Sequence, residues 1–236
     1  MTLYIDTSTS LLNYLSIKRP TYVIFLRLPL GHLQLGEHSK NVKVLKGSNN
    51  GSYLYDPLLL EGLDWSSARN LMSPNITSTD PGEEWLCVRP LQITDHNKGF
   101  LTLLAQLTTV GNVSQHDFER QYWLMQRSGA YYVTVIEDTR SQTIIGAATL
   151  VTELKFIHNA SIRGRLEDVV VNNTYRGKQL GKLIVLTVTL LAKKLGCYKM
   201  SLDCKDNLIP FYKSIGYKIE AGNSNSMIIR YETAPS

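Results

Sequence analysis

The sequence predicts an α/β domain in which helices flank a mixed central sheet. Short apolar runs of strand length alternate along the chain with longer segments of helical length, which is the pattern of this class. Hydrophobic residues make up 43% of the 236 residues and charged residues 19%, so a packed core is expected and general disorder is not. The length fits one domain of ordinary size with a terminal tail.

The N-terminal part, residues 1–54, is expected to be a flexible extension of a domain that covers residues 55–236. It ends near the stretch KGSNNGS, which begins at Lys46 and has the composition of a linker. Targeting or attachment to a membrane surface is an alternative role, because Lys18 and Arg19 precede a short apolar run. No run approaches the roughly 18 to 20 apolar residues of a membrane span, so an integral membrane segment is not expected.

The first half of the domain is expected to contain a strand, two helices and a β-hairpin. Apolar residues at strand spacing predict the strands, and Ser, Thr, Asp and Gly at the segment ends predict the helix boundaries. The expected elements are a strand WLCVRPL from Trp85, a helix that Thr94 or Asp95 caps and that runs toward Leu107, a helix after Ser114 that ends at Gly129, and strands at 131–138 and 143–154.

The second half is expected to alternate between strands and helices. The apolar run after Gly181 is too long for an ordinary strand and predicts a helix, which Gly196 terminates. The expected elements are a strand at 165–171, a helix at about 177–195, a strand at 199–204, a short helix at 210–215 and a strand near 227–231.

The strand, turn and helix in this half carry the clearest chemical signal. The turn points backbone N–H groups and the positive end of the helix dipole at the space above it, which suits phosphate. Gly177 and Gly181 would let a ligand approach the backbone. The P-loop pattern fails because the glycines lie one residue too close together and Leu183 follows Lys182. From spacing alone, a buried turn whose glycines only relieve crowding is an equally good interpretation.

Seven short stretches carry a resemblance to a known enzyme family. They are LTTVG from Leu107, YYVTVIED, ELKFIH from Glu153, RGRLEDVVV, YRGKQLGK, GCYKMSLDC and PFYKSIGY, and they lie between about Tyr55 and Tyr231. These stretches resemble the GNAT acetyltransferase superfamily and, within it, the glucosamine 6-phosphate N-acetyltransferase family. Gln179 differs from the superfamily's usual glycine but agrees with that particular family. The resemblance implies the GNAT fold.

The resemblance further implies that acetyl-CoA is the co-substrate, with its pyrophosphate at the turn. A backbone N–H near Val169 or Val170 would hydrogen-bond the thioester oxygen as that oxygen gains negative charge. The residues implied in cofactor binding are Val169, Val170, Val171, Arg176, Gly177, Lys178, Gln179, Leu180, Gly181 and Lys182.

Catalytic roles are implied for Tyr212, Asp203, Glu167 and Asp168. Tyr212 matches a tyrosine beside the departing sulfur, where a phenol with a reference pKa of about 10 can protonate the thiolate. Asp203 falls on the position that orients the attacking amine, and Glu167 and Asp168 fall on positions at the sugar and its amine. Without the resemblance, Tyr212 would be read as a core aromatic, and the two adjacent carboxylates as partners of arginines on the same strand.

Contacts to the sugar phosphate are implied for a further set of residues. Cations and hydrogen-bond donors suit a phosphate dianion. The residues implied in substrate binding are Thr108, Lys155, Phe156, Ile157, His158, Glu167, Asp168 and Arg230. One departure concerns CoA: the family usually has asparagine at the position of Leu208, whereas this chain has Asn207 one place earlier, which leaves a contact of Asn207 with CoA open.

The expected reaction transfers acetyl from acetyl-CoA to the amine of D-glucosamine 6-phosphate, forming N-acetyl-D-glucosamine 6-phosphate and CoA for UDP-N-acetylglucosamine biosynthesis. One alternative is a GNAT acetyltransferase for another amine, against which ELKFIH and Arg230 argue. A second is a non-catalytic acyl-CoA-binding module, which could dispense with Asp203 and Tyr212.

Other partners follow from charge and residue spacing. The family forms homodimers whose subunits complete each other's sites, so a homodimer is implied. No metal is expected, because no second His or Cys lies at ligand spacing from His158. Nucleic acid is not expected despite the net charge of +5, because Lys and Arg are scattered. Three cysteines without a CxxC pair favour a reducing compartment, hence a cytoplasmic location, with peripheral membrane attachment as an alternative.

Overall fold

The computed structural model describes residues 4–5, 14–19, 22–27, 53–72, 75–175, 177–222 and 226–229. The chain divides into two compact units, residues 1–48 and 49–236. In the first unit, β1 (Tyr4–Ile5), β2 (Tyr14–Arg19) and β3 (Tyr22–Arg27) form an antiparallel sheet in the order β1-β2-β3. Most of residues 1–54 lie outside the described residues, so the flexibility expected of them stays a prediction.

The second unit is built on a five-stranded sheet in the order β4-β5-β6-β7-β8. Neighbouring strands from β4 to β7 are antiparallel, and β8 runs parallel to β7. A parallel pair needs a crossover connection, which the helix α5 (Leu180–Lys194) provides. The strands are β4 (Leu86–Pro90), β5 (Tyr131–Asp138), β6 (Thr143–Leu154), β7 (Ile162–Val171) and β8 (Cys197–Ser201). This mixed sheet confirms the predicted fold class.

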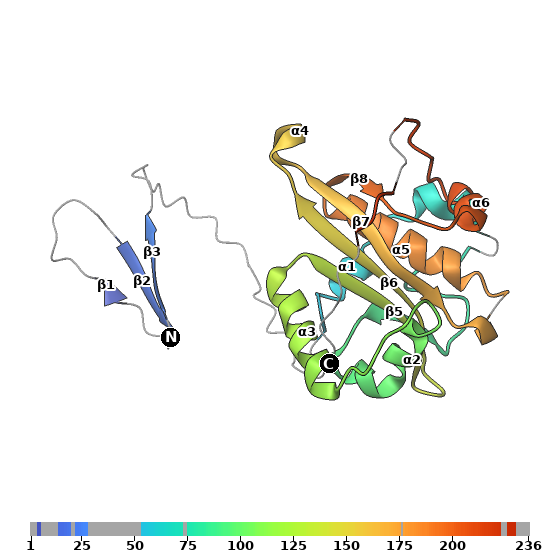
Figure 1. The fold of residues 1–236 in the computed structure, drawn as a ribbon, viewed down its shortest axis with the longest axis horizontal. Helices are drawn as coiled ribbons and strands as arrows, with labels where there is room; N and C mark the ends of the chain where they lie inside the picture. Colours follow the sequence, from blue (N-terminus) through green and yellow to red (C-terminus); the bar gives the residue numbers. More distant parts are fainter. Residues whose placement is uncertain are drawn as a thin grey trace, which may run out of the picture. The chain divides into compact units, whose positions relative to one another are not determined.

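Helices cover both faces of this sheet (Figure 1). The helix α5 packs on β6 and β7 from one side, and α2 (Phe100–Leu104) and α3 (Gln115–Ser128) lie on the other. The remaining helices of the described residues are α1 (Leu58–Glu61), α4 (Ile157–Ala160) and α6 (Ile209–Lys213), with the 3-10 helices η1 (Ser66–Leu71), η2 (Ile93–Lys98), η3 (Asn173–Tyr175) and η4 (Asp206–Leu208).

Two apolar cores form because the strand side chains alternate between the faces. On β5, the neighbours Val135 and Ile136 are both fully buried but belong to different cores. Ile136 packs on the side of α5, and Val135 packs on the side of α2 and α3. The helix α5 lies between the sheet and the segment that holds α1, which explains why most of its circumference is apolar.

The helix α3 has the boundaries that the sequence predicts. Ser114 caps it: the Ser114 Oγ accepts a hydrogen bond from the backbone N–H of Asp117 at 3.1 Å. Gly129 ends it in the left-handed conformation, with φ of 66°. Local capping chemistry was sufficient to predict this element.

The expected helix toward Leu107 is wrong in its start and its continuity. The first helical turn begins at Ile93, so neither Thr94 nor Asp95 precedes it as the cap. Gly99 then divides the segment into η2 and α2, because its φ of 75° is incompatible with a continuous right-handed helix. A capping box explains the shifted start, because Gln92 is the N-cap and the Asp95 carboxylate accepts the backbone N–H of Gln92.

The strand expected near 227–231 is wrong for the part that the structure describes. Residues 226–229 have no regular secondary structure, and Met227 and Ile228 are exposed. Apolar β-branched residues predict a strand, but no neighbouring strand pairs with these residues in the described part of the chain. Residues 230 and 231 lie outside the described residues.

A group of four charged side chains, three of them buried and one half-buried, joins β4, β5 and η2. The Arg89 guanidinium donates to Asp95 through Nη1 and Nη2, each at 2.8 Å, and to Glu137 Oε2 through Nε at 2.8 Å. Lys98 Nζ donates to Glu137 Oε1 at 2.7 Å. The Asp95 carboxylate also accepts the backbone N–H of Gln92 at 2.8 Å and has no exposed surface. Two cations thus balance two anions inside the protein.

Removing one member of this group should be costly. We expect Asp95→Ala to lower the free energy of unfolding by about 3–5 kcal/mol, because Arg89 would stay buried without one of its two carboxylates. As a control, Arg120→Ala breaks the exposed Arg120–Asp117 pair of 3.0 Å and should cost less than about 1 kcal/mol. Urea unfolding followed by circular dichroism measures both. Equal small losses would contradict the structural role of the buried group.

Candidate active site

The pairing between β7 and β8 stops partway along β7. The register ends where Arg165 lies opposite Ser201, whereas β6 continues beside β7 as far as Val171. Residues 166–171 therefore have a strand on one side only among the described residues. Backbone groups that point to the other side of β7 have no ladder partner and are available to a ligand.

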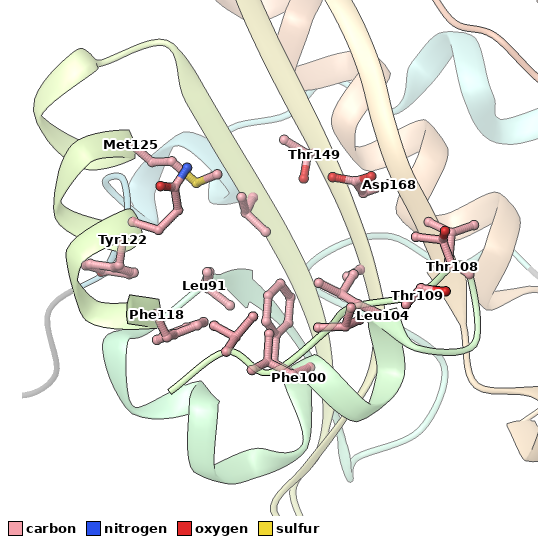
Figure 2. A pocket seen from close by; sticks show the side chains of 17 residues that line it. Leu91, Phe100, Leu104, Thr108, Thr109, Phe118, Tyr122, Met125, Thr149 and Asp168 are labelled. Carbon is pink, nitrogen blue, oxygen red and sulfur yellow. The ribbon is translucent and has the colours of Figure 1, made fainter. Parts of the chain in front are cut away.

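A β-bulge at Asp168 interrupts the pairing of β7 with β6 near the same level. Ala147 lies opposite Val170 and Thr149 opposite Glu167, so two residues of β7 face one residue of β6. Asp168 has φ of 52°, a left-handed conformation that is costly for a non-glycine residue and is concentrated at functional sites. The Asp168 and Thr149 side chains both line a cavity (Figure 2).

This cavity, called the Asp168 cavity, has a volume of about 320 Å³ and lies between the sheet and the helices α2 and α3. Its walls are mainly apolar, with Phe100 and Leu104 from α2 and Phe118 from α3 (Figure 2). The loop that follows α2 contributes Thr108, as the substrate-binding prediction requires. The structure thus brings Thr108 and Asp168 to one cavity.

The Asp168 carboxyl is the acidic group of this cavity. The residue is exposed, and no hydrogen bond or ion pair to its carboxyl is present among the described residues. Desolvation by the atoms around the carboxyl, followed by the negative charge of Glu167, raises its pKa. An unpaired carboxyl with a raised pKa in a cavity is suited to holding an amine or to accepting its proton.

Arg165 joins the other two predicted catalytic carboxylates. Its guanidinium donates to Asp203 through Nη2 and to Glu167 through Nε, and these two contacts raise the Arg165 pKa. Asp203 is exposed and lies two residues after the end of β8. The Arg165–Asp203 contact therefore joins the chain beyond β8 to β7, at the point where the pairing of the two strands ends. Glu167 and Asp203 are therefore paired with an arginine, as carboxylates with a structural role usually are. Asp168 has no such partner among the described residues.

The segment of residues 175–179 between β7 and α5, of which Tyr175 and residues 177–179 are described, is called the phosphate turn after its predicted ligand, and it leads into α5. The helix starts later than expected, at Leu180, because Gly177 and Gln179 have φ of 85° and 55°. A hollow of about 310 Å³ beside the turn is lined by Tyr175, Gly177, Gln179, Leu180, Gly181, Lys182 and Phe211. The first N–H groups of a 15-residue helix lie at this hollow, which favours an anion.

Two lysines near the phosphate turn have protein partners. Lys178 Nζ donates to Glu83 Oε1 at 2.6 Å and lies 5.3 Å from the centre of the Trp85 ring. Lys182 Nζ donates to the backbone oxygen of Leu71 at 3.2 Å. A phosphate would replace or share these partners. Arg176, which is also predicted to bind the cofactor, lies outside the described residues.

Tyr212 lies on α6 next to Phe211, which lines the hollow of the phosphate turn. The residue is buried, with 8% of its surface exposed, and its ring packs edge-on against Phe211 at 5.0 Å and Tyr217 at 5.9 Å. Burial and, to a smaller degree, the nearby Cys204 thiol raise the Tyr212 pKa, so its hydroxyl is protonated at neutral pH. Tyr212 is thus a packed aromatic residue that also carries an available proton.

The predicted phosphate contacts Lys155, Phe156, Ile157 and His158 lie apart from these groups, at the tip of the β6–β7 hairpin. Figure 1 shows α4 at one end of the sheet and α2 at the other. The end of β6, where the tip begins, lies about five residues beyond Thr149. At the usual rise of a strand, this corresponds to roughly 17 Å between Thr149 and the tip. A single chain therefore does not bring this set to the Asp168 cavity.

The side chains of this hairpin tip already have local contacts or are exposed. Lys155 Nζ lies 2.5 Å from Glu153 Oε2, and the His158 ring lies 4.4 Å from the Tyr198 ring. Phe156 is fully exposed. Arg230, the remaining predicted substrate residue, lies outside the described residues.

Sequence reasoning did not identify Thr149, which lines the Asp168 cavity together with the apolar residues of α2 and α3. A hydroxyl inside the otherwise apolar stretch IIGAATLV was a signal that could have indicated it. Asn207 is exposed in η4, and its contact with CoA stays a prediction.

Within the described part of the chain, no group of three or more His, Cys, Asp or Glu side chains is arranged to hold a metal ion. No helix of that part has the length and apolar character needed to cross a membrane.

Known proteins resemble this chain in sequence over most of its length. The chain matches the Acetyltransferase (GNAT) family over residues 98–217. It is 62% identical over 185 residues to a protein of Drosophila melanogaster named probable glucosamine 6-phosphate N-acetyltransferase, across 78% of this chain and 84% of the relative. The glucosamine 6-phosphate N-acetyltransferase of Arabidopsis thaliana is 39% identical over 130 residues, across 55% of this chain and 87% of the relative.

The fold is similar as well. The crystal structure of glucosamine-6-phosphate N-acetyltransferase from Arabidopsis thaliana matches with a TM-score of 0.57 and 35% identity, and the match covers 64% of this chain and 100% of that one. The family match includes β7, the phosphate turn and Tyr212. By its sequence and its fold, this chain belongs to the GNAT acetyltransferase family and, within it, to the glucosamine 6-phosphate N-acetyltransferases.

Proposed function

We propose that this chain transfers the acetyl group of acetyl-CoA to the amine of D-glucosamine 6-phosphate, forming N-acetyl-D-glucosamine 6-phosphate and CoA. The observation that carries the proposal is the open edge of β7, which has the phosphate turn at its end and the Asp168 cavity beside it. A thioester along that edge would meet a cofactor site and an acceptor site together. The names of the similar proteins support the choice of sugar.

Acetyl-CoA binds along β7 and the phosphate turn in this proposal. The helix dipole and the N–H groups at the start of α5 favour the charge of the pyrophosphate. Gly177 and Gly181 keep side chains out of the way. The residues proposed to hold it are Val169, Val170, Val171, Arg176, Gly177, Lys178, Gln179, Leu180, Gly181 and Lys182.

The neutral amine attacks the thioester carbonyl, so a C–N bond forms, the C–S bond breaks and sulfur leaves as a thiolate. A backbone N–H at Val169 or Val170 stabilises the carbonyl oxygen as it gains negative charge. The sugar amine should titrate nearer an α-amino group, at about 8, than lysine, at about 10.4, so a neutral fraction is present at neutral pH. The proton that the nitrogen then loses passes to a carboxylate or to solvent.

Four side chains assist these steps in the proposal. Asp203 orients the amine, and Glu167 and Asp168 hold the sugar and its amino group. The Tyr212 hydroxyl, which is protonated at neutral pH, gives its proton to the thiolate and regains one from solvent.

A homodimer explains the separation of the predicted substrate contacts. Lys155 and His158 lie at the hairpin tip, far from the Asp168 cavity of the same chain. The tip exposes Phe156 completely and Leu154 to 84%, which favours its burial against another surface. We propose that the tip of one copy completes the substrate site of a second copy. The tip contributes Lys155, Phe156, Ile157 and His158, and Thr108 and Arg230 supply the remaining contacts.

The cellular role proposed for this reaction is supply of N-acetyl-D-glucosamine 6-phosphate for UDP-N-acetylglucosamine biosynthesis, in the cytoplasm. Both substrates are charged and water-soluble, which fits a cytoplasmic reaction.

The phosphate of the acceptor should be required for efficient reaction. We expect CoA release with glucosamine 6-phosphate to exceed that with glucosamine by about 10- to 100-fold in kcat/KM, because Lys155, His158 and Arg230 would lose their anionic partner. Thiol release from acetyl-CoA with amino sugars, sugar phosphates and peptides measures this and tests other amines. Equal efficiency with both sugars would refute the proposed acceptor.

Filling the hollow of the phosphate turn should weaken cofactor binding. We expect Gly181→Trp to raise the KM for acetyl-CoA, because the new ring would occupy the space where the pyrophosphate meets backbone N–H groups. Gly181→Ala is the matched control, since its methyl would lie 3.7 Å from the Phe211 ring, an ordinary contact. A folded Gly181→Trp protein with an unchanged KM would sink the assignment.

Deleting the Tyr212 hydroxyl should reduce turnover more than binding. Tyr212→Phe keeps the ring contacts with Phe211 and Tyr217, so we expect kcat to fall by roughly 10² to 10⁴ if the hydroxyl acts as a general acid. The measurement uses saturating concentrations of both substrates, with thermal unfolding as the check on folding. Turnover at the wild-type rate would leave Tyr212 with a packing role alone.

A further inference from the structure

Tyr175 is fixed by a contact that the proposed chemistry does not use. Its hydroxyl donates a hydrogen bond to Asp138 Oδ2 at 2.8 Å, between residues 37 positions apart in the chain. Asp138 is the last residue of β5, and Tyr175 is the first residue of the phosphate turn. The bond therefore ties the turn to the central sheet.

The Asp138 carboxylate is itself held firmly. It accepts Arg140 Nη2 at 2.8 Å, Arg140 Nε at 3.1 Å and the Arg140 backbone N–H at 3.0 Å. Hydrogen bonding by the Arg140 guanidinium holds the pKa of Asp138 well below its usual range. Burial acts against this shift, and the Tyr175 hydroxyl adds to it. The Asp138 side chain is only 2% exposed. Tyr175 thus donates to a charged and buried acceptor, and a hydrogen bond to a charged acceptor is the stronger kind.

Trp85 supports the same contact from the preceding segment. The Arg140 guanidinium lies 3.6 Å above the Trp85 ring, and the Tyr175 ring centre lies 6.3 Å from it. Lys178, on the other side of Gly177, also lies near this ring, with its Nζ at 5.3 Å. Residues on both sides of Gly177 therefore lie against Trp85.

Gly177 lies between Tyr175 and Lys178, the two described residues of the turn whose side chains contact Trp85. Gly177 has φ of 85°, and a Cβ added there would meet nothing within 4 Å. The space beside the Cα of Gly177 is thus open, and its positive φ favours glycine. The described contacts on either side of it are the start of α5 and the hydrogen bond of Tyr175. Donors that are already oriented bind an anion more tightly than donors that must be ordered on binding.

We propose that Tyr175 is a positioning residue whose hydrogen bond to Asp138 holds the phosphate turn in the conformation that binds the pyrophosphate of CoA. Tyr175 acts through the backbone of the turn and does not act on the reacting atoms. The proposal rests on the cofactor site of the proposed function.

The test is the Tyr175→Phe variant of the full chain, with CoA binding measured by calorimetry in the absence of sugar. We expect the Kd for CoA and the KM for acetyl-CoA to rise by about 5- to 50-fold, whereas kcat at saturation changes by less than about twofold. Hydrogen exchange of the ligand-free protein should become faster in residues 172–182. Asp138→Asn, which keeps the shape but weakens the acceptor, should change the Kd in the same direction.

Tyr55→Phe is the matched control. The Tyr55 hydroxyl is bonded to Thr134 Oγ1 on the same strand β5, at 2.6 Å, but does not contact the phosphate turn. Tyr55→Phe also deletes a tyrosine hydroxyl that is hydrogen-bonded to β5. We therefore expect it to lower thermal stability and to leave the Kd for CoA unchanged. Its use separates a loss of positioning from a general loss of stability.

Two results would overturn the proposal: a wild-type Kd for CoA in Tyr175→Phe, or an equal loss of affinity in Tyr55→Phe. Failure of the proposed function looks different. If the wild-type protein binds CoA but does not acetylate glucosamine 6-phosphate, the function is refuted and the positioning role of Tyr175 is supported by the binding data alone. If the wild-type protein does not bind CoA, both proposals fail.

Discussion

The pairing of β7 with only part of β8 is the constraint on which the site depends. A strand inside a sheet normally has both backbone edges bonded, and polar backbone groups left without partners are costly. Here β8 ends at Ser201, and the following chain leads toward α6. Residues 166–171 of β7 keep β6 on one edge only. The sheet thus keeps oriented donors beside a cavity, which a closed ladder could not do.

The surrounding structure keeps this opening from closing. The helix α5 is packed into the larger core and fixes the end of β7 through the phosphate turn. On the other face, α2 and α3 fix the wall of the Asp168 cavity. Arg165 bridges β7 and the segment beyond β8 through Glu167 and Asp203. Rigid elements therefore surround the opening, as oriented donors require.

The environments of the titratable groups suit different tasks. Burial keeps the Tyr212 hydroxyl protonated, so it is prepared to donate. The Asp168 carboxyl lacks a hydrogen-bonding partner among the described residues and has a raised pKa, whereas Glu167 and Asp203 share an arginine. The protein thus places a proton donor (Tyr212), a carboxyl available to an amine (Asp168) and an ion-paired cluster around Arg165 near one edge of the sheet. Their environments differ because the residues come from segments that are buried to different degrees.

Patterns among neighbouring residues predict the α/β class, the cap and stop of α3 at Ser114 and Gly129, and the strand, turn and helix around Gly177. These depend on local periodicity, capping and backbone freedom, which neighbouring residues set. Four features could be seen only in the folded chain: the point where β8 leaves β7, the bulge at Asp168, the break at Gly99 and the distance of the hairpin tip from the cavity. Each of these depends on strand register and on packing between residues far apart in the chain, and local patterns do not encode such contacts.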